Sequence, residues 1–247
     1  MIDTKVEIKA VVMATISMCT QRCWHCKFGV ASLGLPQLMP EAFVVKAIDD
    51  LAFINYKKRF SLFNGNEPLL DPRLEDFYRY AKKKLPDVPL TLTSNGDLAT
   101  ENLLKRLFDS GLQKINFSLH QGSRKDALIS YQQQFGKDKV TIWNHEDSKH
   151  FHNHGGLIKS EKVSQKRYGT TGCSLPFKQL NIYPDCTMGL CCVDRAENIK
   201  VEIGNTPIWQ VFFENAELNS YRKMLADDKR NINPCIECSY NGLDYFD

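Results

Sequence analysis

The sequence lacks the features that would place the protein in a membrane or on a nucleic acid. None of its apolar runs approaches the roughly 20 residues of a membrane-spanning helix. Its formal net charge is only +3, so charge gives no reason to expect a nucleic acid or a membrane surface as partner. The first residues include acidic side chains and no continuous apolar stretch, and they do not resemble a secretory signal. We therefore expect a cytoplasmic protein.

Cysteine is absent from a long central stretch, although the chain of 247 residues contains nine cysteines. Three of them fall within eight residues, and the next one is Cys173. An odd total, close spacings and the lack of an export signal argue against a disulfide framework. Two separate metal sites explain this distribution better. The cysteines are Cys19, Cys23, Cys26, Cys173, Cys186, Cys191, Cys192, Cys235 and Cys238.

The first half of the chain alternates strand and helix patterns. Such alternation predicts βαβ units and a parallel sheet with right-handed crossovers. A complete eightfold barrel needs about 250 residues, but fewer than 150 precede a change in composition. We therefore predict an α/β fold, an incomplete TIM-like barrel of about five parallel strands. The expected strands are 8–16, 60–63, 90–93, 115–119 and 140–143, and the expected helices are 41–53, 74–85, 100–110 and 125–135.

The change in composition begins near residue 145, where the chain becomes polar and shows no clear periodicity. We expect a core domain over 1–150, a linker over 151–172 and a small auxiliary domain over 173–247. Within the last region, short apolar runs predict strands and longer patterns predict helices. The expected strands are 179–183 and 190–193, and the expected helices are 208–213 and 218–225.

The cysteine triplet Cys19-x3-Cys23-x2-Cys26 is the strongest chemical signal. Three thiolates on one tight loop can bind three irons of a [4Fe–4S] cluster and leave the fourth iron open to a chelating small molecule. The alternative is a zinc site, which needs four ligands when it is structural. His25 could supply the fourth ligand.

The triplet lies at the end of the first expected strand, in the run CTQRCWHC, and resembles the signature of the radical S-adenosylmethionine (SAM) superfamily. Trp24 and His25 precede the last cysteine, where the family has an aromatic residue. The resemblance implies that the three cysteines hold a [4Fe–4S] cluster whose open iron binds SAM.

Three further motifs follow later strands in the order of that family: Gly65-Asn66-Glu67-Pro68, Thr93-Ser94-Asn95-Gly96 and Ser118-Leu119-His120. Gly65-Asn66-Glu67-Pro68 resembles its glycine–glycine–glutamate–proline loop, with Asn66 in place of the second glycine. Carboxyl ends of barrel strands are where such folds place their active sites. By resemblance, the residues that contact SAM are Trp24, His25, Gly65, Asn66, Glu67, Asn95 and Ser118.

The later cysteines resemble those of the twitch domain, a shortened form of the SPASM auxiliary-cluster domain. By position, the resemblance assigns a second [4Fe–4S] cluster to Cys173, Cys191, Cys235 and Cys238. Cys192 could replace Cys191. A zinc ribbon is the alternative for these four ligands.

A cluster that four cysteines saturate cannot bind substrate and is suited to carrying electrons. The resemblance therefore implies a radical SAM oxidoreductase that dehydrogenates an alcohol of a small polar or sugar-like molecule. Size and layout resemble the inosamine dehydrogenase branch of the superfamily, from aminoglycoside biosynthesis. A flavodoxin- or ferredoxin-type protein would supply electrons, and His120, His152 and His154 are candidates for the base that accepts the hydroxyl proton.

Other functions remain open from the sequence. Related enzymes modify peptides or epimerise their substrates, although the few residues before the first strand favour a small molecule. From another class, the chain could be a non-catalytic iron–sulfur electron carrier or a zinc-binding protein. Neither would need Glu67, Asn95 and Ser118 at strand ends.

Overall fold

The computed structural model describes residues 5–30, 35–120, 124–144, 151–164, 166, 168, 172–226 and 229–242. The chain forms two compact units. The first, which we call the barrel unit, comprises residues 12–20 and 36–148. The second, which we call the terminal unit, comprises residues 1–11, 21–35 and 149–247.

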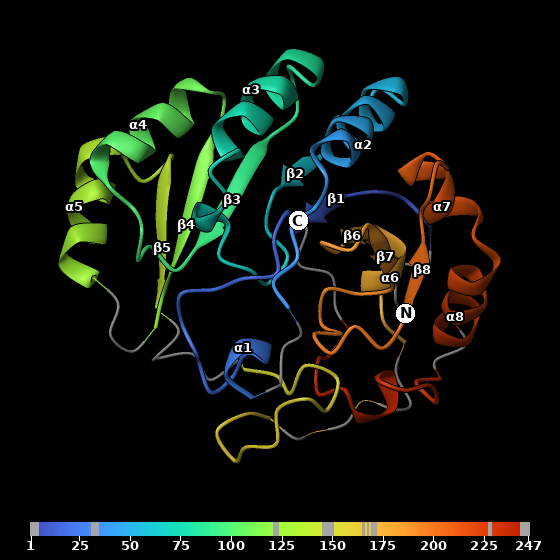
Figure 1. The fold of residues 1–247 in the computed structure, drawn as a ribbon. Coiled ribbons are helices and arrows are strands. Elements are labelled where there is room, and N and C mark those ends of the chain that lie inside the picture. The colour runs from blue at the N-terminus through green and yellow to red at the C-terminus, as the bar shows by residue number, and fades with distance from the viewer. Residues whose placement is uncertain are drawn as a thin grey trace. The chain divides into compact units, whose positions relative to one another are not determined.

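The barrel unit is an open α/β sheet, drawn from dark blue to yellow-green in Figure 1. Strands β2, β3, β4 and β5 pair in parallel, and β1 lies next to β2 in the strand order. Helices α2 to α5 alternate with these strands along the chain and lie along the outer side of the sheet (Figure 1). The expected incomplete parallel barrel is thereby confirmed. The elements are β1 (Ala10–Met13), α2 (Glu41–Phe53), β2 (Arg59–Ser61), α3 (Leu74–Lys84), β3 (Leu90–Ser94), α4 (Glu101–Asp109), β4 (Lys114–Leu119), α5 (Lys125–Phe135) and β5 (Val140–Asn144), with a 3-10 turn at Pro68–Leu70.

Local sequence explains where these helices begin and which face they bury. In α4, the side chain of Thr100 accepts a hydrogen bond from Leu103 N, which satisfies one of the free amides of the first turn. In α2, the buried residues recur at helical spacing and form the face that packs on the sheet. That face consists of Val44, Ala47, Ile48 and Leu51.

The parallel register aligns the carboxyl ends of the central strands. Ser94 at the end of β3 pairs with Phe117 near the end of β4. The loops that follow β2, β3 and β4 therefore emerge at one edge of the sheet, where parallel α/β folds place their sites.

The terminal unit contains a small antiparallel sheet in the order β6-β7-β8, drawn in orange in Figure 1. Residues 5–9 belong to this unit because Glu7 N donates to Phe177 O and Lys9 N donates to Lys178 O. The elements are α1 (Lys27–Val30), α6 (Leu175–Lys178), β6 (Gln179–Ile182), β7 (Thr187–Gly189), β8 (Lys200–Glu202), α7 (Ile208–Glu214), α8 (Ala216–Ala226) and a 3-10 turn at Cys235–Glu237.

The strand expected at 190–193 is wrong, because the strand of this region is β7 at Thr187–Gly189. A tight turn makes the strand begin earlier than expected. Cys186 in this turn has a positive φ of 65°, and Tyr183 N donates a hydrogen bond to the O of Thr187, the residue after Cys186. The chain therefore returns to pair with β6 at once, and residues 190–193 lead into a loop. Sequence patterns also missed α1, α6 and β8, which have three or four residues each and show no periodicity.

The expected domain boundary at residue 150 falls within 145–150, outside the described residues. In the part of the chain that the structure describes, no helix has both the length and the apolar character needed to span a bilayer.

Candidate functional site

Glu67 lies in the loop after β2, and its carboxylate is almost completely buried, with 1% of the residue exposed. Oε1 accepts hydrogen bonds from Ser94 Oγ at 2.8 Å and Leu69 N at 3.0 Å, and Oε2 accepts one from Asn95 N at 2.8 Å. Burial nevertheless raises the pKa of Glu67 to about 7, because the three hydrogen bonds offset only part of the desolvation cost. A cationic ligand beside this carboxylate would restore its charge.

The glycine and asparagine before Glu67 shape the same loop. Gly65 has a φ of 76°, in the left-handed region that glycine adopts without strain. Asn66 is buried, and its Oδ1 accepts a hydrogen bond from Asn64 N at 3.0 Å. Its Nδ2 is buried and has no hydrogen-bond partner among the residues that the structure describes. A buried donor of this kind fits a ligand with an acceptor group at this loop.

Asn95 connects the end of β3 to the first cysteine of the triplet. Its Nδ2 donates to Cys19 Sγ at 3.7 Å and to Thr20 Oγ1 at 2.9 Å. Thr20 Oγ1 donates in turn to Asp97 Oδ2 at 2.7 Å, and Asn95 Oδ1 accepts from Asp97 N at 2.9 Å. This closed network fixes the amide of Asn95 toward the thiol. Glu67, Asn95 and Cys19 thus occupy one corner of the barrel unit, since Glu67 N also donates to Met18 O.

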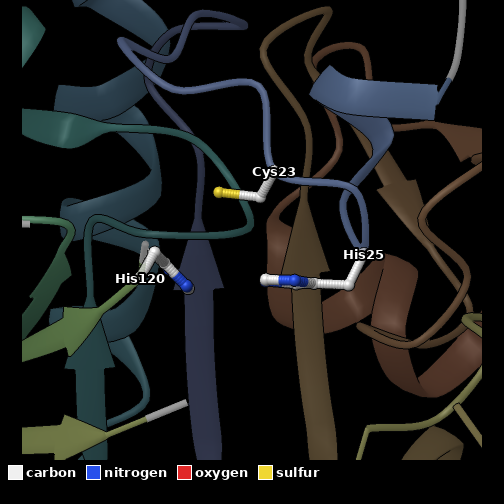
Figure 2. Close-up of side chains that lie close together, drawn as sticks. All are labelled: Cys23, His25 and His120. Atoms are coloured by element: carbon white, nitrogen blue, oxygen red, sulfur yellow. The ribbon is translucent and has the colours of Figure 1, made fainter. Parts of the chain in front are cut away.

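Ser118 and His120 lie at the end of the next strand, β4. Ser118 is buried within the strand, and His120 follows directly after it (Figure 2). The sequence placed both residues at this edge of the sheet, and the structure does the same.

The second and third cysteines of the triplet belong to the terminal unit, together with Trp24 and His25. Figure 2 shows Cys23 and His25 on the same loop ahead of α1. Cys26 N donates to Cys23 O at 3.0 Å, which makes the loop a tight turn. Phe151 packs against both aromatic residues: its ring stacks on His25 at 4.4 Å and meets Trp24 edge-on at 5.7 Å between ring centroids.

Two further candidate residues, His152 and His154, lie in contact, with ring centroids 4.4 Å apart. Burial lowers the pKa of His152 to about 4 and the pKa of His154 well below its usual value, so both imidazoles are neutral at pH 7. His152 also lines a cavity of about 260 Å³ in the terminal unit. The other residues that line it are Phe151, Ser164, Tyr168, Ser239, Tyr240 and Asn241.

The later cysteines converge on a second, smaller cavity of the same unit. Four thiols line it: Cys173, Cys191, Cys235 and Cys238. Cys192 packs against an apolar cluster formed by Cys173, Leu175, Val193 and Cys238, but it is not among the residues that line the cavity. Cys186 is not among the lining residues either. The cavity wall therefore contains the four cysteines that the sequence singled out for a second cluster.

The chemistry of these thiols fits a cationic group bound in the cavity. Burial raises the pKa of Cys173 to about 11 and of Cys235 to about 12, so each thiolate needs a cationic partner at neutral pH. A tetrahedral zinc ion with Zn–S bonds of 2.3 Å would bring its thiolates about 3.8 Å apart. Among the described residues, no three of these thiols lie within 4.8 Å of one another.

Sequence reasoning missed Thr20, Phe151 and Arg230. Thr20 orients Asn95, and Phe151 packs on the cysteine loop. Arg230 is buried in the wall of the cavity with the four cysteines. Thr20 lies within the run CTQRCWHC, whereas Phe151 and Arg230 lie outside the motifs, and only the contacts in the folded chain reveal the roles of all three.

Comparison with known proteins agrees with this geometry. Residues 13–146 match the radical SAM superfamily. The chain is 27% identical over 232 residues to the S-adenosyl-L-methionine-dependent 2-deoxy-scyllo-inosamine dehydrogenase of Niallia circulans, covering 90% of this chain and 89% of that enzyme. A shorter stretch of 109 residues is 28% identical to the GTP 3′,8-cyclase of Rhodococcus opacus (strain B4), covering 43% of this chain and 30% of that protein.

Solved structures share the fold. The crystal structure of BtrN in complex with AdoMet and 2-DOIA has a TM-score of 0.84 at 22% identity, over 96% of this chain and 94% of that chain. The structure of anSMEcpe with bound AdoMet has a TM-score of 0.51 at 11% identity, over 89% of this chain and 84% of that chain. The superfamily match spans more than half of the chain, including Cys19, Cys23, Cys26 and the strand-end residues. The chain therefore belongs to the radical SAM superfamily, whose members use SAM and a [4Fe–4S] cluster.

Proposed function

We propose that this protein is a radical SAM dehydrogenase that oxidises a hydroxyl group of a small, polar, sugar-like molecule by two electrons. In this proposal a second [4Fe–4S] cluster, on Cys173, Cys191, Cys235 and Cys238, accepts one of the electrons. The observation that carries it is the cavity lined by those four thiols, because a cluster with four cysteine ligands has no open iron for substrate and can transfer electrons.

The similarity to an inosamine dehydrogenase supports the same reaction. It extends over about nine-tenths of both chains, so the resemblance includes the region of the later cysteines as well as the barrel. We therefore take 2-deoxy-scyllo-inosamine, an amino-substituted cyclic polyol, as the first substrate to test.

Residues after strands β2 and β3, Ser118 near the end of β4, and residues of the cysteine loop would hold SAM and its cluster. Cys19, Cys23 and Cys26 would bind the first cluster. Glu67 would pair with the ammonium group of SAM, whose positive charge compensates the buried carboxylate. The remaining contacts would come from Gly65, Asn66, Asn95 and Ser118, with Trp24 and His25 on the cysteine loop.

SAM and the first cluster, held by Cys19, Cys23, Cys26 and Glu67, would supply the radical chemistry that removes a hydrogen atom from the substrate carbon. The substrate must then lose one proton and one electron to become a ketone. In this proposal, the four thiols that line the smaller cavity would hold the cluster that accepts the electron. His152 is the preferred proton acceptor because it lines the larger cavity, although burial lowers its pKa to about 4 and makes it a weaker base; His120 and His154 are the alternatives. A flavodoxin- or ferredoxin-type protein would supply the electron for SAM cleavage.

The test is anaerobic reconstitution followed by iron analysis and product analysis. We expect about eight irons per chain, and one ketone formed for each 5′-deoxyadenosine with 2-deoxy-scyllo-inosamine as substrate. Iron near four per chain would remove the second cluster and with it the proposed oxidation. Bound zinc without any 5′-deoxyadenosine would overturn the enzymatic assignment.

Two adjacent cysteines offer a matched pair of variants. Cys191 lines the cavity, whereas Cys192 does not. We expect Cys191→Ala to lose about four irons and ketone formation, and Cys192→Ala to keep both. The reverse result would assign the ligand to Cys192.

A further inference from the structure

Arg230 is a buried cation beside the later cysteines, with only 1% of the residue exposed. It lines the same cavity as the four thiols. Buried arginines are rare because burial of a charge is costly unless it is compensated. Arg230 therefore places a positive charge in the wall of the thiol-lined cavity.

The guanidinium donates hydrogen bonds to two of the three chain segments that carry cavity cysteines. Nη2 donates to Gly172 O at 2.8 Å, next to Cys173, and Nη1 donates to Tyr240 O at 2.6 Å, two residues after Cys238. Gly242 leaves room for this arrangement, since a Cβ there would lie 2.1 Å from Nη2. Arg230 thus ties together backbone segments that are 68 residues apart, at Gly172 and Tyr240.

The charge of Arg230 also acts on the thiols. Its positive charge lowers the pKa of Cys173, Cys235 and Cys238, although burial outweighs this effect and the net pKa of each is raised. Asp194 also lines the cavity, and its negative charge raises the pKa of Cys235 and Cys238, which opposes the effect of Arg230. The carboxylate of Asp194 is already engaged by Asn198 Nδ2 at 2.7 Å and Ile199 N at 2.9 Å.

A four-iron cluster with four thiolate ligands is negatively charged and becomes more so when it accepts an electron. A fixed cation in a low-dielectric wall stabilises the reduced form more than the oxidised form, because attraction grows with the added charge. From the placement of Arg230 among the four thiols, we propose that it is a positioning residue that makes the second cluster a better electron acceptor. The inference rests on the proposed function, since it presupposes that cluster.

The test compares two buried arginines of the terminal unit. Arg222 is 3% exposed and also donates to backbone carbonyls, at Pro176 O and Phe212 O, but it is not among the residues that line the thiol cavity. Full-length chains carrying Cys19→Ala, Cys23→Ala and Cys26→Ala isolate the second cluster. In this background the iron content and the midpoint potential are measured, the latter by a redox titration followed by electron paramagnetic resonance.

We expect Arg230→Gln to shift the midpoint potential to a more negative value at an unchanged iron content of about four per chain. Arg222→Gln should leave the potential where it is. An unchanged potential in a fully loaded Arg230→Gln protein would overturn the inference.

If Arg230→Gln does not load iron, the Arg230→Lys variant tests the inference instead. Lysine keeps the positive charge but cannot form the paired hydrogen bonds of a guanidinium. A loaded Lys variant near the parent potential supports the charge effect, and one shifted clearly negative contradicts it. Absence of iron from the parent protein itself would instead refute the proposed second cluster, so the two failures are distinguishable.

Discussion

At the scale of single residues, Glu67 is a carboxyl group whose environment favours its neutral form. Its pKa of about 7 in the folded chain lies above the ordinary value, so the folded state binds a proton that the unfolded state has released between about pH 4.5 and 7. Its contribution to stability is therefore present at low pH and is lost as the pH rises through 7.

We expect the free energy of unfolding of the SAM-free protein to fall by up to about 3 kcal/mol between pH 4.5 and 8 through this group. Glu67→Gln cannot ionise and should lack this component, although the variant loses one hydrogen-bond acceptor. Urea unfolding of both proteins at several pH values under reducing conditions checks the difference. Parallel pH profiles for the two proteins would refute the raised pKa.

Asn95 gives a second prediction at this scale, because its amide donates to the thiol of Cys19. Hydrogen bonds to cluster sulfurs raise the reduction potential. Asn95→Ala should therefore make the potential of the first cluster more negative and slow SAM cleavage by a weak reductant.

Thr20→Val is the comparison, since it removes the hydroxyl that orients Asn95 and keeps the amide that donates to Cys19. Its potential should move less than that of Asn95→Ala. Equal shifts in both variants would mean that the network as a whole, and not the contact to sulfur, sets the potential.

At the scale of elements, the short helix α1 closes the cysteine loop. Gly29 lies within it, and a Cβ at this position would lie 2.1 Å from the carbonyl oxygen of Cys23. Since this neighbour is backbone between two cluster ligands, it cannot move aside without opening the turn.

We expect Gly29→Ala to lose most of the iron of the first cluster, about four irons per chain, and to abolish SAM cleavage. Gly204→Ala is the comparison, because a Cβ there meets nothing within 4 Å, although its positive φ adds some strain. Full iron loading of Gly29→Ala would show that the loop has more freedom than this packing implies.

At the scale of the whole molecule, the chain is not divided simply into a first half and a second half. Residues 5–9 hydrogen-bond to Phe177 and Lys178, and Lys27 in α1 forms an ion pair with Glu197 at 2.6 Å. Lys178 is itself completely buried and donates to Lys5 O and Glu7 Oε1. Two early segments of the chain thus depend on residues far along the sequence.

A chain truncated after residue 148 should therefore lose the order of residues 21–30 and fail to hold the first cluster. Hydrogen exchange followed by mass spectrometry would show rapid exchange in that loop. Helices α2 to α5 should stay protected and serve as the internal control, because their contacts lie within the barrel unit. A truncated chain with a protected loop and full SAM cleavage would contradict this dependence.

Much of the barrel was determined by sequence alone. Helices α2 and α5 have the predicted bounds, and the five parallel strands appear where apolar runs end in turn residues. These patterns are local, since a helix or a strand repeats its buried face every few residues. The spacing of Cys19, Cys23 and Cys26 is local as well, and together with the motifs at the later strand ends it indicated the family.

Only the tertiary structure decided which residues meet around the later cysteines and how the cysteine loop is supported. It placed Cys191 and not Cys192 in the cavity wall, brought Arg230 beside the thiols, and set Phe151 against the loop of Cys23. It also showed that the strand expected at 190–193 is β7 at Thr187–Gly189, because the turn at Cys186 sets where the chain begins to pair with β6. These outcomes depend on burial and on contacts between residues far apart in the chain, and no short-range periodicity records them.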